Sequence, residues 1–325
     1  MLKRILMAGL AVAGLSLAAL PANADDYPSR TVTIIVPYPA GGPTDQAARV
    51  IAQSLSKQFN QSVSVENLSG GGTIIATNKV AKAAPDGYTL MLHNLQISAN
   101  VSLYKNLPFD TMKDLTPIIL VNRNPLVLVG RNTLEANNLD ELLALMKKTT
   151  LKAAIPGFGA TGHLATSLLA QESHSKLDMI PYRGAAPALN DILGGHVDLF
   201  FATPQSIIQH VNTGKMKAYG VTSKEPLPEL PKVKSFVSVL GPKLEFHYWQ
   251  AFYAPAQTPK PIIDKINAAV QKAVSDPAIL KTWSSQGVEP FPANERSVDA
   301  AKKFMKEEVE RWGKVIKDNN IHLDQ

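Results

Sequence analysis

The sequence contains no cysteine among its 325 residues. Disulfides, thiolate metal sites and cysteine nucleophiles are therefore excluded, and packing alone must hold the fold. The seven histidines show no pair at the i, i+4 spacing that would bring two ring nitrogens to one metal. No Gly-x-Ser-x-Gly elbow is present, and the residues do not assemble into a Ser-His-Asp set. We expect no metal, no cofactor and no catalytic residues.

Concentrated charge is also missing. The formal net charge is +6, but the basic residues are scattered along the chain. A nucleic-acid interface would need a basic stripe with interleaved aromatic residues, and none is visible. We therefore expect no nucleic-acid partner. A hydrophobic fraction of 45% is ample for a core, and the length suggests two domains.

The long apolar run of the chain stands at its N-terminus. Lys3 and Arg4 precede an uncharged stretch over residues 5–20, and Ala22-Asn23-Ala24 is a cleavage site of the A-x-A type. The stretch is shorter than the ~20 residues of a membrane span, which disfavours a membrane anchor. Residues 1–24 are therefore predicted to be a signal peptide. No second run of about 18 apolar residues follows, so we expect no membrane span after cleavage and a chain exported from the cytosol.

Strand, loop and helix patterns alternate along the rest of the chain, as is typical of parallel α/β units. Strands are expected near residues 31–36, 62–65, 88–92, 117–121, 125–129, 152–155, 179–182, 197–201, 218–221 and 247–254. Helices are expected from Thr44 to Phe59 and near residues 73–83, 139–148, 162–172, 185–193, 261–275 and 297–317. The apolar stretches around 117–129 and 247–254 are interpreted as crossings between two lobes. This predicts one lobe from residues 25–123 plus 253–325 and a second from residues 124–252.

The motif Gly157-Phe158-Gly159-Ala160-Thr161-Gly162 is a literal G-x-G-x-x-G between a strand and a helix. A dinucleotide site would also need an acid after the next strand, whereas Asp178 precedes that strand and Arg183 follows it. We therefore disfavour a nucleotide ligand. The glycines and the free N–H groups at the helix start still favour an anion. His163 is expected to cap or pack locally.

The loop over residues 37–45 follows the same logic. Gly41 and Gly42 present backbone N–H groups before a helix that Thr44 is expected to cap, and Asp45 suits the helix dipole. The loop has no lysine, so it is not a phosphate P-loop. The run Gly70-Gly71-Gly72 is expected to be structural. His93 to Gln96 form a polar loop after a strand, where ligands lie in open α/β sheets.

Taken together, these segments resemble the Bug family of tripartite tricarboxylate transporter solute-binding receptors. The resemblance covers essentially the whole chain after residue 24. It is carried by residues 27–30 (YPSR), 35–45 (IVPYPAGGPTD), 85–90 (PDGYTL), 162–164 (GHL), 181–184 (PYRG), 191–195 (DILGG) and 254–256 (APA).

The resemblance implies a fold of the type II periplasmic binding protein kind, with two Rossmann-like lobes, two crossing strands and a ligand cleft between the lobes. It implies a periplasmic receptor that closes on a small carboxylate and delivers it to the membrane permease of a tripartite transporter. Two alternatives remain open. One is an orphan receptor that presents its ligand to a sensor kinase, and the other is an exported α/β enzyme.

The resemblance also implies that the first glycine loop, over residues 38–42, holds one carboxylate of the ligand. The loop from Gly159 to Gly162 and the start of the helix after Gly184 would contact the other side of the ligand. Many members of that family carry an acidic residue where this chain has Ala202. Without that acid, the ammonium group of an amino acid would lack a partner, which disfavours an amino-acid ligand. Phe158 and His93 make an aromatic or amide-bearing carboxylate as plausible as citrate. The expected ligand-binding residues are Tyr38, Pro39, Ala40, Gly41, Gly42, Thr44, Asp45, His93, Gln96, Phe158, Gly159, Ala160, Thr161, Gly162, Arg183, Gly184, Ala185, Ala202 and Thr203.

Overall fold

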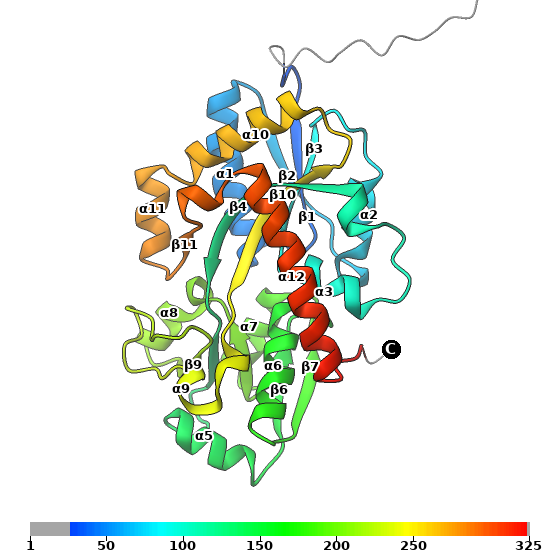
Figure 1. Ribbon diagram of the computed structural model, residues 1–325. Coiled ribbons are helices and arrows are strands. Elements are labelled where there is room, and N and C mark those ends of the chain that lie inside the picture. Colours follow the sequence, from blue (N-terminus) through cyan, green and yellow to red (C-terminus); the bar gives the residue numbers. More distant parts are fainter. Residues whose placement is uncertain (1–26, 324–325) are drawn as a thin grey trace, which may run out of the picture.

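A computed structural model describes residues 27–323, and within them the strands form two sheets (Figure 1). The predicted signal peptide lies outside the described residues. The larger sheet has the strand order β11-β4-β10-β3-β1-β2. Its strands are β1 (Val32–Val36), β2 (Val63–Asn67), β3 (Thr89–Asn94), β4 (Leu115–Asn124), β10 (Tyr248–Pro255) and β11 (Glu289–Pro290). The smaller sheet, in the order β7-β6-β8-β5-β9, contains β5 (Val127–Arg131), β6 (Leu151–Ile155), β7 (Leu177–Pro181), β8 (Leu199–Ala202) and β9 (Met216–Val221).

Each sheet has a parallel half and an antiparallel half. Strand β1 runs parallel to β2 and β3, and β6 runs parallel to β7 and β8, as helical crossovers require. In contrast, β10 is antiparallel to β3 and β4, and β5 is antiparallel to β8 and β9. The two α/β lobes predicted from the sequence are confirmed, but their sheets are mixed because the crossing strands join each sheet antiparallel.

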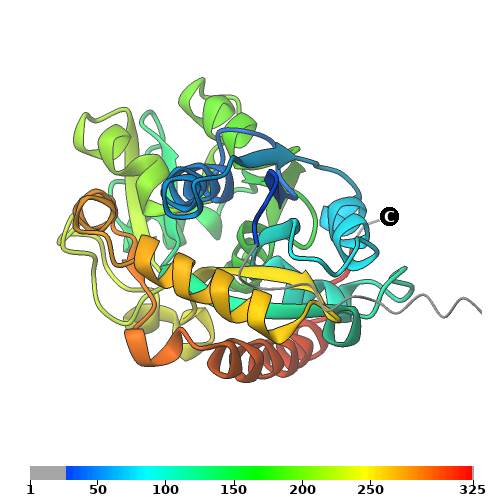
Figure 2. The ribbon, with the colours of Figure 1, turned by 90° about the horizontal axis from the view of Figure 1, so that it is seen from above.

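Helices cover both faces of the larger sheet. They are α1 (Pro43–Phe59), α2 (Ile74–Ala81), α3 (Gln96–Leu103), α4 (Thr111–Asp114), α10 (Lys260–Ala273), α11 (Pro277–Ser284) and α12 (Val298–Asp318). Alternate residues of a strand point to opposite faces, so Ile34 packs with α1 and α10, and Ile35 packs with the cluster that includes α12. Figure 2 shows α1 and α12 on opposite sides of this sheet.

The smaller sheet is covered in the same way. Its helices are α5 (Leu139–Met146), α6 (Thr161–Glu172), α7 (Ala185–Leu193), α8 (Pro204–Asn212) and α9 (Val237–Leu240). Phe200 packs in a cluster with residues of α7 and α8, whereas Phe201 packs in the cluster of α6. The cluster of Phe201 and α6 also includes Trp249 and Tyr253 of β10. One apolar core is therefore shared by the two lobes where β10 crosses between them.

Strands β4 and β10 run side by side from one lobe toward the other (Figure 1). All eight residues of β10 are buried, and its pairing with β4 is interrupted by register shifts at Gln250/Ala251 and Phe252/Tyr253. Both strands belong to the larger sheet. The lobe boundaries at residues 123/124 and 252/253 stay a prediction.

Helix α12 spans the junction of the lobes (Figure 1). The buried carboxylate of Glu308 accepts hydrogen bonds from the indole nitrogens of Trp249 (2.7 Å) and Trp312 (3.0 Å). Toward its C-terminal end, Arg311 donates to the carbonyl of Glu245 at 2.6 Å, and the amide of Gln171 in α6 donates to the carbonyl of Asn319. The chain thus returns to the second lobe after completing the first.

Two local predictions are wrong. Thr44 does not cap α1, because Gly42 is the N-cap residue and the Thr44 hydroxyl bonds to Tyr248 instead. Residues 93–96 are not a loop, since His93 and Asn94 end β3 and Gln96 begins α3.

Candidate functional site

A cavity of about 60 Å³ lies between the two lobes. This is several times the space that one water molecule needs, so the cavity suits a small molecule. The predicted residues that line it are Tyr38, Pro39, Gly42, Thr44, Ala160, Thr161, Gly162, Gly184, Ala185, Ala202 and Thr203. The structure brings these residues together from segments up to 165 positions apart (203 − 38). Their contact with a ligand stays a prediction.

Four helices begin at this cavity. Gly42, Ala160, Gly184 and Thr203 are the N-cap residues of α1, α6, α7 and α8, and each of them lines the cavity. None of these four N-cap side chains accepts a hydrogen bond from a backbone N–H of its helix, in contrast to Asn138 of α5 and Ser297 of α12. The N–H groups of His163 and Ser206 bond to the carbonyls of Ala160 and Thr203. No cap side chain takes up the other N–H groups of the first turns, and the positive ends of the four helix dipoles favour an anion.

Within the described residues, the lining of this cavity includes no charged side chain. An anion there would be held by neutral donors and helix dipoles. An ammonium group would find no carboxylate to pair with, which makes its desolvation costly. The composition of the lining therefore favours a carboxylate without an ammonium group over an amino acid.

Hydroxyl groups supply further donors. Thr161 is 4% exposed, and its Oγ1 has no hydrogen-bond partner. Tyr248 Oη accepts from the amides of Asn94 (3.3 Å) and Gln250 (3.0 Å), so its own proton points to Thr44 Oγ1 at 2.8 Å. The Thr44 proton then remains available to a ligand. Burial raises the pKa of Tyr248, which keeps this phenol protonated.

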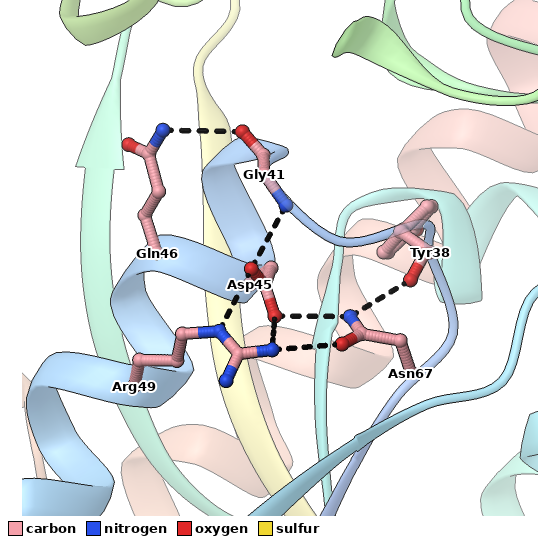
Figure 3. Close-up of polar contacts among 6 residues, drawn as sticks. All are labelled: Tyr38, Gly41, Asp45, Gln46, Arg49 and Asn67. Carbon is pink, nitrogen blue, oxygen red and sulfur yellow. Dashed lines mark hydrogen bonds and ion pairs between the residues drawn. The ribbon is translucent and has the colours of Figure 1, made fainter.

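Asp45 anchors the first glycine loop, over residues 38–42, on the side away from the cavity (Figure 3). Its buried carboxylate accepts from the backbone N–H of Gly41 (2.9 Å), from Arg49 Nε (3.0 Å) and from Asn67 Nδ2 (3.0 Å). The same amide of Asn67 donates to the carbonyl of Tyr38 at 3.0 Å. Burial alone would raise the pKa of Asp45, but these hydrogen bonds outweigh it and hold the pKa below its usual value. Asp45, Gly41 and the exposed Ala40 are outside the cavity lining.

His93 is fully buried beside the cavity rather than in its wall. Its Nδ1 accepts from the backbone N–H of Asn94 at 2.8 Å, and its Nε2 lies 3.1 Å from Thr73 Oγ1. Burial lowers the pKa of His93 to about 3, so the ring is neutral. The predicted local role of His163 is confirmed, since its Nδ1 accepts from the backbone N–H of Gly159 at 3.1 Å.

A second, open hollow of about 660 Å³ adjoins the cavity. The two share Tyr38, Pro39, Pro156 and Gly184 as walls. Gln96, Phe158 and the exposed Arg183 line this hollow, as does the run Gly70-Gly71-Gly72. Gly159 packs closely against α3, where an added Cβ would contact Leu103, Asn100 and Gln96.

Sequence reasoning missed several lining residues, namely Pro43, Asn94, Leu126, Pro156, Ala186, Phe200, Phe201, Ser206 and Tyr248. Asn94 and Ser206 each follow the end of a predicted strand, where ligand-binding residues of α/β sheets are expected. Tyr248 had no local signal, since it meets Thr44 only through the return of β10. Across residues 27–323 the structure contains neither a cluster of three or more potential metal ligands nor a helix suited to crossing a membrane.

The family described as "Tripartite tricarboxylate transporter family receptor" matches residues 47–321 of the chain. The structure is similar to that of the periplasmic binding protein BugD, with a TM-score of 0.87 and 36% identity over 91% of this chain and 99% of that one. These matches confirm the predicted family and the periplasmic binding protein fold.

Two similar structures contain bound acids. One is MatC from Rhodopseudomonas palustris with malate, with a TM-score of 0.84 and 31% identity over 89% of this chain and 100% of that one. The other is a protein of R. palustris with adipate, with a TM-score of 0.86 and 30% identity over 91% and 99% of the two chains.

Proposed function

The chain belongs to the tripartite tricarboxylate transporter receptor family, and from this premise we propose that it binds a small carboxylate in the cavity between its lobes. The ligand would be delivered to the membrane permease of a tripartite transporter. We further propose that the protein works in the periplasm after residues 1–24 have been removed. The family is one of solute-binding receptors rather than of enzymes.

The convergence of four helix N-termini without side-chain capping bonds on one uncharged cavity carries this proposal. Helix α1 belongs to the first lobe, and α6, α7 and α8 belong to the second. A carboxylate in the cavity would accept from donors of both lobes and so draw them together. The unpartnered hydroxyl of Thr161 adds a donor whose burial is compensated only when a ligand oxygen reaches it.

Relatives bind malate and adipate, which are carboxylates of different length. The apolar part of the lining, which includes Leu126, Phe200 and Phe201, favours a ligand with an apolar body. We therefore place both aliphatic and aromatic carboxylates in the ligand class.

Isothermal titration against a panel of such acids tests the proposal. We expect one acid to bind at a single site and to be recovered unchanged, as shown by mass spectrometry. Turnover of the bound acid would favour the exported enzyme. Uptake of the bound acid can also be measured in a strain that lacks the permease. If the acid binds but its uptake is unchanged in that strain, the sensor-kinase receptor is favoured.

A further inference from the structure

One face of α3 meets the second lobe at the mouth of the cleft. Gln96 Nε2 donates to the carbonyl of Phe158 at 3.2 Å. A Cβ on Gly159 would lie 3.0 Å from Leu103 Cδ1 and 3.2 Å from Asn100 Oδ1. Gln96, Asn100 and Leu103 are spaced at i, i+4 and i+7, so they share one helix face. None of these five residues lines the 60 Å³ cavity.

Gln96 also connects this contact to the first glycine loop. Its Oε1 accepts from Tyr38 Oη at 3.2 Å, and its side chain is 2% exposed. Burial raises the pKa of Tyr38 well above its usual value, so the phenol keeps the proton that it donates. One amide side chain thus joins a wall of the cavity in the first lobe to the loop before α6 in the second.

We propose that Gln96, Asn100 and Leu103, packed against Phe158 and Gly159, form a latch that stabilises the closed receptor without touching the ligand. The latch goes beyond the proposed function and relies on it only for the ligands used as probes. The apparent affinity of a receptor is its intrinsic affinity reduced by the fraction of molecules in the binding-competent form. Weakening the latch therefore lowers the affinity for every ligand by the same factor, whereas losing a ligand contact affects ligands unequally.

The variant Gln96→Leu removes the hydrogen bonds of this side chain to Phe158, Tyr38 and the carbonyl of Gly72, and it keeps the side-chain size. Titration with malate and with adipate should show about a tenfold loss of affinity, equal for the two acids. An unchanged affinity would overturn the latch. A loss confined to one acid would also overturn it, because Gln96 would then be a ligand contact.

A distance measurement tests the latch without any ligand. The chain has no cysteine, so Ser64→Cys in the first lobe and Asn190→Cys in the second can be spin-labelled cleanly. Both positions are exposed. In the labelled background, Gln96→Leu should shift the distance distribution toward longer distances, both in the absence and in the presence of acid. Identical distributions would overturn the latch, even if no carboxylate of the panel binds and the proposed function itself fails.

The contact at Gly159 allows a steric test. Gly159 has φ +75°, and Gly195 on the surface has φ +76° with no atom within 4 Å of an added Cβ. Both alanine variants carry similar backbone strain, but only Gly159→Ala should lengthen the label distance. Adding Leu103→Ala to Gly159→Ala should restore part of the short-distance population. Equal behaviour of the two glycine variants, or no restoration, would contradict the packing on which the latch depends.

Discussion

Thr161 is the residue whose hydroxyl has the most to gain from a ligand, since it is buried and unpartnered. Thr161→Val keeps the shape and removes this donor. A hydrogen bond to a charged group contributes ~1.5–3 kcal/mol, so the affinity for the best-binding acid should fall roughly 10- to 100-fold. The free energy of unfolding should change little, because the folded protein loses no hydrogen bond. Titration and chemical denaturation measure the two effects.

Thr166 provides the matched control on the same helix. Its hydroxyl donates to the carbonyl of Gly162 at 2.7 Å, and it is not in the cavity lining. Thr166→Val should therefore leave the affinity unchanged. If Thr161→Val binds the acid as tightly as Thr166→Val, the site assignment of Thr161 is wrong.

His93 makes stability depend on pH. Its pKa is about 3 in the folded protein because of burial, against ~6.5 in an unfolded chain. Below pH 6.5 the unfolded state takes up a proton that the folded state does not, so the free energy of unfolding falls by ~1.4 kcal/mol per pH unit. Between pH 6.5 and 5 this amounts to ~2 kcal/mol. Denaturation of wild type and His93→Gln at both pH values should show a loss smaller by about this amount in the variant.

His247 acts in the same direction, because burial lowers its pKa to about 4 and nearby Arg123 and Arg311 add to this effect. The comparison between wild type and His93→Gln cancels that contribution. Equal pH dependence of His93→Gln and wild type would show that His93 does not remain neutral in the fold.

At the scale of elements, the loop between β1 and α1 depends on Asp45. An amide at this position could not accept from Gly41, Arg49 and Asn67 together, and the charge of Arg49 would lose its partner. We expect Asp45→Asn to destabilise the protein by ~1–3 kcal/mol and to weaken ligand binding indirectly, because the loop over Tyr38 to Gly42 loses its anchor. Thermal unfolding and titration of the same preparation measure both.

Asp264 offers a comparison on the surface, where it forms an exposed i, i+4 pair with Lys260. Asp264→Asn should change stability by less than ~0.5 kcal/mol and leave binding intact. A matching effect of the two substitutions would show that the Asp45 network does not position the loop.

The longer elements could be predicted from the sequence because each has a strong local signal. The β-branched run at Val32–Val36 and the amphipathic helices α10 and α12 are examples. Helices α3 and α8 were not predicted, because α3 is buried on several sides and lacks a polar stripe, and α8 begins directly after a strand at Pro204. Thr44 illustrates the limit of local rules, since a partner 204 residues away determines what its hydroxyl does.

The candidate site could be predicted where a loop carries glycines before a helix, as at Gly42 and Gly184. It could not be predicted where a side chain arrives from a distant strand, as Tyr248 does. For Asp45 and His93 the sequence indicated polarity near the site. It did not indicate that Asp45 anchors the loop from behind or that His93 is buried beside the wall.

At the scale of the whole molecule, we expect the lobes to close around the cavity when a ligand binds. Its walls come from both lobes, which touch where Gly184 meets Pro39. We expect the hinge to use the irregular pairing of β4 and β10, where the register shifts. Saturation with a bound acid should therefore lower the radius of gyration in small-angle scattering. Identical profiles with and without the acid would contradict a closing cleft.

If main-chain groups at four helix starts hold the anion, as proposed, this has a consequence for the evolution of the receptor. Every residue except proline carries an N–H, so a point mutation in the lining leaves most of these donors in place. Exchanges at Ala185, Ala202 or Phe201 would reshape the space around the body of the ligand. Lineages of such receptors can thus drift from one acid to another through single substitutions, while the preference for an anionic end is inherited with the backbone.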